Sequence, residues 1–205
     1  AGRGVVRRAI EARHRHDLPA LSPTRIGDVF FTHLHSDHVL DYPELAHTLW
    51  WRRAEPLRAW GPRGLREVTE GLQAMLAVDT RLRVEGSQPI PGPGLYRVAV
   101  TEIGPGVVLE RDGLSIEAFE VDHGDIHPAF GFRVEAPDLT VVISGDTGPS
   151  KAVIEHARGA DLLVHEVVSA RALASLPPFW KAYHGTAHTP ADALARIARE
   201  ARPGR

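Results

Sequence analysis

The stretch Thr32-His33-Leu34-His35-Ser36-Asp37-His38 places three imidazoles and one carboxylate within six positions. Imidazole together with carboxylate suits zinc and other first-row divalent ions. In an extended segment, residues two apart point the same way, so His33 and His35 can bind one ion together. Asp37 and His38 follow after a turn and can face a second ion. The alternative is a solvated, histidine-rich loop, but packing or solvation explains this density of ligands poorly, and the stretch predicts a metal site.

A short apolar and aromatic run, Asp28–Thr32, precedes the histidines. Runs of this kind are typical of buried strands. The histidines therefore lie at the C-terminal end of a predicted strand, which is where α/β proteins bind their ligands.

Composition limits the class of protein. The length of 205 residues and the apolar fraction of 43% predict a single globular domain, residues 1–205. The formal net charge of -2 gives no general attraction to phosphate backbones, which argues against a nucleic-acid substrate. Because the chain has no cysteine, His, Asp and Glu must supply every strong metal ligand. No apolar run approaches the length of a membrane span, so no membrane partner is expected.

The two ends of the sequence suggest an internal piece of a longer protein. The chain begins at Ala1 without a methionine or a visible signal peptide, and we expect a cytoplasmic location. It ends with a helical pattern followed by Pro203 and Gly204, at a point where a further strand would normally follow.

The apolar pattern predicts interleaved helices and strands, which by itself indicates an α/β class. Helices are expected over Val5–Ala12, Tyr42–Ala54, Arg63–Leu76, Pro149–Arg158 and Pro190–Arg202. Strands are expected over Asp28–Thr32, Leu57–Trp60, Tyr96–Ile103, Leu114–Val121, Gly131–Glu135, Leu139–Ser144 and Asp161–His165. Loops are expected over Pro19–Pro23 and Ser87–Leu95.

The motif HxHxDH after a hydrophobic strand resembles that of the metallo-β-lactamase superfamily of metal-dependent hydrolases. Further segments match in order: Val121-Asp122-His123-Gly124, Gly145-Asp146-Thr147, the strand ending in His165-Glu166, and His188-Thr189-Pro190. The last two resemble segments of ribonuclease Z and its arylsulfatase-like and phosphodiesterase-like relatives. The resemblance covers Asp28–Arg202. It implies an αββα sandwich with mixed β-sheets, without the family's first strands and its final strand.

The resemblance also implies a dinuclear site, with two divalent ions that are zinc, or alternatively manganese or iron. It assigns His33, His35 and His123 to the first ion, Asp37 and His38 to the second, and Asp146 to a bridging position. The second ion is one ligand short, because the family's last histidine follows a strand that would come after Arg205. His184 could substitute for it, but its position does not match the motif.

Several assignments have competing interpretations. His127 competes with His123 as the ligand. Asp146 could cap a helix that starts near Pro149, since aspartate is a good N-cap residue. Thr189 and Pro190 could simply begin the last helix, which would give His188 no chemical role.

The resemblance implies hydrolysis of an ester. Asp37 would orient or deprotonate the attacking water, His188 would act as general acid, and His165 and Glu166 would orient neighbouring groups. In ribonuclease Z a long basic arm for tRNA lies between the equivalents of His123 and Asp146. Only 22 residues separate these two positions here. We therefore expect a small phosphodiester or sulfate ester as substrate.

Two other functions remain open: a ribonuclease Z-like tRNA 3′-processing endonuclease, and a catalytically silent metal-binding domain. A homodimer is a further expectation that the sequence leaves open.

The segment Trp50-Trp51-Arg52-Arg53 interleaves aromatic and basic residues, as do Arg58, Trp60, Arg63 and Arg66 nearby. Such a pattern can stack bases and hold phosphates. The favoured interpretation is structural, with the tryptophans packing a helix and the arginines solvating it.

Overall fold

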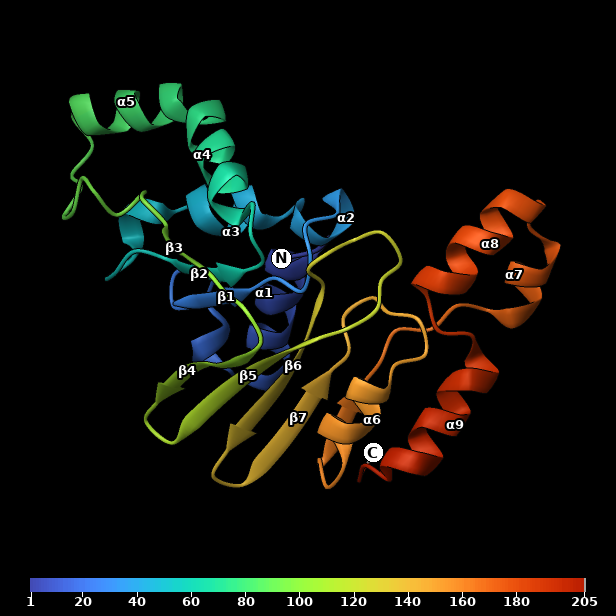
Figure 1. The fold of residues 1–205 in the computed structure, drawn as a ribbon. Coiled ribbons are helices and arrows are strands. Elements are labelled where there is room, and N and C mark those ends of the chain that lie inside the picture. The colour runs from blue at the N-terminus through green and yellow to red at the C-terminus, as the bar shows by residue number, and fades with distance from the viewer. Residues whose placement is uncertain (205) are drawn as a thin grey trace. The chain divides into compact units, whose positions relative to one another are not determined.

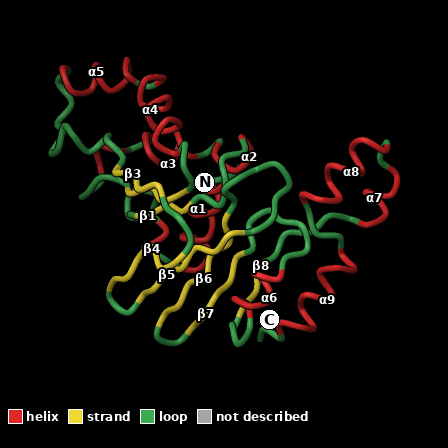
Figure 2. The backbone as a smooth tube through the Cα atoms, viewed as in Figure 1, coloured by secondary structure: helices red, strands yellow, loops and turns green. Residues whose placement is uncertain are grey.

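The computed structural model describes residues 1–204, and the chain divides into two compact units. Unit 1 is Ala1–Glu102 and unit 2 begins at Ile103. Helices and strands alternate along unit 1, while unit 2 has four consecutive strands followed by helices and one further strand. Both units combine helices with a sheet, which confirms the α/β class (Figures 1 and 2). None of the described helices is both long enough and apolar enough to cross a bilayer.

Unit 1 is built on a three-stranded parallel sheet in the order β1-β2-β3. Its strands are β1 (Asp28–Phe30), β2 (Arg58–Gly61) and β3 (Ala99–Glu102). Parallel neighbours need a crossover between them, and helices supply it here. The helices are α1 (Val5–His16), α2 (Ser36–Val39), α3 (Tyr42–His47), α4 (Leu65–Met75) and α5 (Ala77–Glu85), with 3-10 turns η1 (Pro19–Leu21) and η2 (Trp50–Arg52).

The core of unit 1 supports the segment that follows β1. Phe31 is buried, and its ring centroid lies 4.9 Å from that of Tyr42. The Tyr42 hydroxyl lies 2.8 Å from the Thr69 hydroxyl oxygen, which itself donates to the Leu65 carbonyl. Burial raises the pKa of Tyr42 to about 12, so the hydroxyl stays protonated and donates to Thr69. Phe31 is thereby held two residues before the first histidine of the motif.

Unit 2 is built on a five-stranded mixed sheet in the order β4-β5-β6-β7-β8. The first three pairings are antiparallel, and β8 joins β7 in parallel. Asp112 and Gly113, both with positive φ, form the two-residue turn between β4 and β5. The strands are β4 (Gly106–Arg111), β5 (Leu114–Glu120), β6 (Phe130–Ala136), β7 (Leu139–Ile143) and β8 (Leu162–Val164).

Two helices of unit 2 close its core and two others form a hairpin. α6 (Lys151–Ala157) packs against β6, β7 and α9 (Ala191–Ala201), and Figure 1 shows α6 and α9 side by side. The core formed there contains Phe119, Val142, Val153, Ala157 and Ile197, among others. α7 (Ala170–Ser175) and α8 (Pro178–Ala187) pack against each other.

The structure corrects several of the predicted elements. The helix predicted over Tyr42–Ala54 ends at His47, because Leu49 takes a left-handed conformation. This break accompanies the complete burial of Trp50, so tertiary packing outweighs helix propensity here. The predicted loop Pro19–Pro23 contains the 3-10 turn η1. Sequence patterns did not predict α5, β4, α7 or α8.

Candidate metal centre

The histidine motif of unit 1 leaves the sheet directly after β1. The Phe31 amide still donates to the Trp60 carbonyl, at 2.8 Å, and the chain then turns away. His33 is completely buried, and its Nε2 lies 3.1 Å from His35 Nδ1. Two nitrogens that each lie about 2.0–2.1 Å from one tetrahedral zinc are about 3.3 Å apart. The pair therefore fits two ligands of a single ion, as the i, i+2 spacing predicts.

The second half of the motif is helical. The single turn α2 starts at Ser36, and the His38 amide donates to the His35 carbonyl at 3.0 Å. The turn brings the His38 ring to 4.2 Å from the His33 ring, centroid to centroid. Asp37 lies on the same turn, with its side chain 66% exposed and its Oδ2 3.5 Å from His38 Nε2. Strand, loop and one helical turn thus bring the rings of His33, His35 and His38 together, while the Asp37 carboxylate lies next to His38 and is largely exposed.

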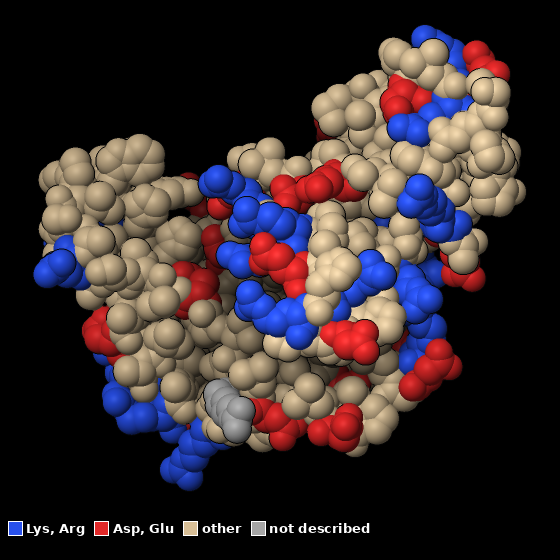
Figure 3. Space-filling view, turned by 180° about the vertical axis from the view of Figure 1, so that it is seen from behind, with Lys and Arg blue, Asp and Glu red and all other residues tan. Residues whose placement is uncertain are grey.

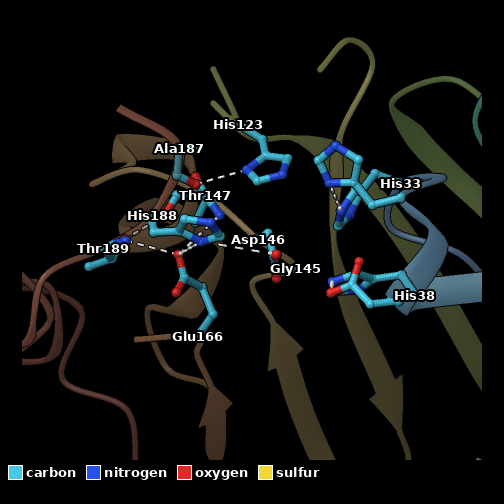
Figure 4. A network of polar contacts seen from close by, with 12 residues as sticks. His33, His38, His123, Gly145, Asp146, Thr147, Glu166, Ala187, His188 and Thr189 are labelled. Carbon is cyan, nitrogen blue, oxygen red and sulfur yellow. Dashed lines mark hydrogen bonds and ion pairs between the residues drawn. The ribbon is translucent and has the colours of Figure 1, made fainter. Parts of the chain in front are cut away.

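In unit 2, His123 follows β5 and is 1% exposed. Its Nδ1 lies 2.8 Å from the carbonyl oxygen of Ala187 (Figure 4). A carbonyl only accepts, so Nδ1 carries the hydrogen and Nε2 is the ring's lone-pair nitrogen. Fixing the tautomer in this way is typical of ligating histidines. His127, the competing candidate, is exposed, and the geometry favours His123.

Asp146 lies in the turn after β7, where Gly145 has a φ of 64°. The Gly148 amide donates to the Asp122 carbonyl at 2.7 Å, which ties this turn to the segment before His123. The residue that caps α6 is Ser150, whose hydroxyl oxygen accepts from the Val153 amide. The capping interpretation of Asp146 is therefore wrong, while its role as ligand stays a prediction.

Glu166 connects three segments of unit 2. One carboxylate oxygen, Oε1, accepts from the Thr189 amide at 2.8 Å and lies 3.3 Å from His188 Nδ1 (Figure 4). The same oxygen accepts from the Thr147 amide at 3.4 Å. The Glu166 amide in turn donates to the Ser144 hydroxyl. This one side chain therefore fixes the end of β8, the aspartate turn and the segment that carries His188.

His188 is held by two carboxylates. Its Nδ1 faces Glu166 and also lies 4.0 Å from Asp146 Oδ2. Thr189 does not cap α9, because Pro190 occupies that position. The Thr189 hydroxyl instead donates to the Thr147 carbonyl at 2.7 Å, so the backbone after His188 is pinned to the aspartate turn.

His165 is arranged differently from its neighbour. Its Nδ1 lies 2.6 Å from the Glu166 carbonyl oxygen, and its Nε2 is buried without a hydrogen-bonding partner among the described residues. These contacts are consistent with a supporting position next to Glu166.

The aromatic and basic segment of unit 1 matches the favoured interpretation only in part: Trp50 packs into the interior, but Arg53 is buried and does not solvate a helix. Trp50 is completely buried. The Trp51 ring is covered by the Arg83 guanidinium, at 3.6 Å from the ring centroid. Arg53 is also buried, and donates to the carbonyls of Ile26 and Leu45.

Sequence reasoning missed the groups that position the ligands. The Ala187 carbonyl is a backbone atom that any residue could supply, so no sequence signal identifies it. Thr147 and Thr189 are both completely buried. In the sequence these two threonines suggested only helix caps, although Thr147 follows Asp146 and Thr189 follows His188.

Comparison with known proteins defines the class of protein to which this fold and these residues belong. The family described as Beta-lactamase superfamily domain matches residues 1–205, and the chain belongs to this family. The metallo-β-lactamase fold expected from the sequence is confirmed.

Individual proteins of known sequence or structure are also similar to this chain. The chain is 33% identical over 180 residues to a protein named Ribonuclease Z from Mycolicibacterium gilvum (strain PYR-GCK), covering 86% of this chain and 60% of that one. Two solved structures share the fold. Human tRNase Z, short form, has a TM-score of 0.69 at 19% identity, covering 100% of this chain and 76% of that chain. The metallo-β-lactamase fold protein YhfI from Bacillus subtilis has a TM-score of 0.63 at 17% identity, covering 96% and 68%. The chain thus spans about 60% of the length of its ribonuclease Z relative.

Proposed function

We propose that this chain carries the metal centre of a hydrolase that cleaves phosphodiester bonds. The observation that carries the proposal is the His33 and His35 pair, whose facing nitrogens have the spacing of two ligands on one ion. Family membership supports it, because the pair occupies the motif by which the sequence resembles metal-dependent hydrolases. We further propose that units 1 and 2 act as one domain, with ligands for one centre drawn from both.

The proposed ligands follow the assignment made from the sequence. His33, His35 and His123 would hold the first ion, Asp37 and His38 would hold the second, and Asp146 would be shared by both. This imidazole-rich set with carboxylates suits zinc, and manganese or iron are the alternatives. When bound, the ions supply Lewis-acid activation of a water and stabilise negative charge on the phosphoryl oxygens.

Side chains of this chain accept and donate the protons of the reaction. Asp37, being largely exposed, can accept a proton from a water as its oxygen attacks phosphorus. The bond from phosphorus to the leaving oxygen breaks, and that oxygen takes a proton from His188. Glu166 faces Nδ1 of His188, so the opposite nitrogen, Nε2, is the one directed to the leaving oxygen. Glu166 is therefore a positioning residue for the general acid, and His165 supports it.

The relatives favour RNA as the substrate, since their name is Ribonuclease Z. This differs from the small ester expected from the sequence. One observation still favours a small phosphodiester or sulfate ester as the second candidate: the 22 residues between His123 and Asp146 are largely occupied by β6 and β7. That leaves no room there for a basic arm.

The test is hydrolysis of bis(p-nitrophenyl) phosphate by the zinc-loaded chain. We expect turnover by the wild type, and loss of it in His35→Ala and Asp146→Ala with unchanged circular dichroism. Because the metal centre supplies several kcal/mol of transition-state stabilisation, each loss should be roughly 10³-fold or more. His127→Ala, an exposed histidine of unit 2, is the matched control and should keep wild-type turnover. Unchanged turnover in either of the first two variants contradicts the assignment, and zinc binding without any turnover supports the silent domain.

A further inference from the structure

An aromatic row runs along α8 and ends at His188. Trp180 and His184 are four residues apart on one face of α8, and His188 follows directly after the end of the helix. The Trp180 and His184 rings are stacked, with centroids 5.7 Å apart and an interplanar angle of 23°. The His184 and His188 rings follow at 5.4 Å and 32°. The row therefore leads from the exposed start of α8 to the proposed general acid.

Most side chains of α8 are exposed within residues 1–204. Trp180 is 49% exposed and Phe179 is 74% exposed, while Ala187 is the only buried residue of α8. Phe179 and Tyr183 flank Trp180, with ring centroids 5.5 and 6.1 Å away. Large aromatic side chains left in water at this density mark a binding surface more often than a packing surface.

The charge around the row fits an aromatic ligand attached to a phosphate. Between Ala170 and His188 the charged side chains are Arg171 and Lys181. In Figure 3 the α7–α8 hairpin, at the upper left, is mostly tan. A surface of this kind offers ring faces for stacking and little charge for tracking a long phosphate backbone.

We propose that Trp180 and His184 form a stacking platform for a nucleobase carried by the leaving alcohol of the substrate. This inference rests on the proposed function, in which His188 gives its proton to the leaving oxygen. The group attached to that oxygen must then lie beside His188, which is where the row ends. A ring system bonded to the leaving alcohol meets His184 first and Trp180 next. The preferred substrates are therefore esters whose leaving alcohol is a nucleoside, alone or at the end of an RNA strand.

The test is calorimetric titration of the zinc-loaded chain with two probes. Adenosine 3′-monophosphate carries a base, and glycerol 3-phosphate carries the same phosphate without one. We expect the nucleotide to bind more tightly by roughly 5- to 150-fold, the range expected for one base stacked on an aromatic side chain. Trp180→Ala should remove most of this margin while the affinity for glycerol phosphate stays within about twofold. Trp180→Phe, which keeps a ring, should retain most of it.

Trp51→Phe is the matched control, because it removes a tryptophan that is covered by Arg83 in unit 1. It should leave both affinities unchanged. Equal affinity of the wild type for the two probes overturns the platform, and so does an equal loss for both probes in Trp180→Ala. Bis(p-nitrophenyl) phosphate turnover is measured in parallel. If there is no turnover but the nucleotide still binds more tightly than glycerol 3-phosphate, the proposed hydrolase is contradicted while the base-binding surface is supported.

Discussion

The predicted ligands of unit 1 and those of unit 2 are positioned in different ways. In unit 1 the four predicted ligands lie within six consecutive positions, on one strand end and one helical turn. In unit 2 the site residues span His123 to His188 and come from four separate loops. The first set is local and the second depends on contacts between distant segments. Substitutions outside the ligands should therefore disturb unit 2 far more than unit 1.

The supporting contacts show the same difference. His33 Nδ1 is 3.1 Å from the hydroxyl of its neighbour Thr32. His123 Nδ1 instead relies on the Ala187 carbonyl, 64 positions away in the sequence. Glu166 accepts from the amides of Thr147 and Thr189, which lie 19 positions before it and 23 positions after it. The network in unit 2 can thus be broken at one side chain without touching a proposed ligand.

Outside the proposed metal ligands, the largest effect is expected for His188→Ala. Loss of a general acid costs roughly 10²- to 10⁴-fold when the leaving group is an alcohol that needs a proton. With p-nitrophenolate, which leaves without one, the same variant should lose far less. Turnover of a dinucleotide and of bis(p-nitrophenyl) phosphate, measured side by side, gives the two ratios. Equal losses with both substrates would show that His188 does not deliver the proton.

Glu166→Gln should have the next largest effect. The amide keeps the size of the side chain but cannot accept from the Thr189 amide and face His188 with a negative charge at the same time. Positioning partners of this kind are worth roughly 10- to 100-fold in activity. Glu155→Gln, at an exposed site in α6, is the control. The loss should again be greater with the dinucleotide, and a loss independent of the leaving group would argue for a purely structural role.

Gly148→Ala tests how far unit 2 depends on close backbone contacts. An added Cβ would lie 2.6 Å from the Thr186 carbonyl oxygen, which belongs to the backbone and cannot rotate away. We expect a loss of about 1–3 kcal/mol in the free energy of unfolding, measured by urea denaturation of the whole chain. Gly185→Ala in α8 is the control, since an added methyl group there would have nothing within 4 Å and alanine favours a helix. Equal stability of both variants would contradict the tight contact.

The smallest effect concerns pH and unit 1. Burial lowers the pKa of His47, so the unfolded chain binds a proton that the folded chain excludes. The unfolded state then gains protons first as the pH falls, and the free energy of unfolding decreases below about pH 6.5. Tryptophan fluorescence, measured in a Trp180→Phe background, reports on unit 1, which contains Trp50, Trp51 and Trp60. The slope with pH should shrink in His47→Gln, and an unchanged slope would assign it to other groups.

The same difference between the units decides how much the sequence could reveal. β1 and the histidine motif were predictable because they are contiguous, and β5 to β8, α6 and α9 follow ordinary apolar patterns. α5, α7 and α8 were missed because their apolar residues, such as Leu82 and Phe179, face solvent and give no buried stripe. β4 could have been found, since Asp112-Gly113 is a strong hairpin signal.

In the candidate site, the site residues themselves were easier to predict than the groups that hydrogen-bond to them. The motifs identified His123, Asp146, Glu166 and His188 as candidates, and the structure ties all four into one network within unit 2. The hydrogen bonds that connect them involve backbone groups and the buried Thr147 and Thr189. These contacts exist only after folding brings the loops together, so no local pattern could reveal them.

The central proposal is that His33 and His123 bind the same ion. The most direct test is the zinc content per chain of His33→Gln, His123→Gln and the double variant after dialysis, with circular dichroism to check the fold. If one ion is shared, each single variant should lose the same amount of zinc per chain, and the double variant should lose no more than either single variant. Losses that add in the double variant would mean that each histidine serves a separate site, and would contradict a shared ion.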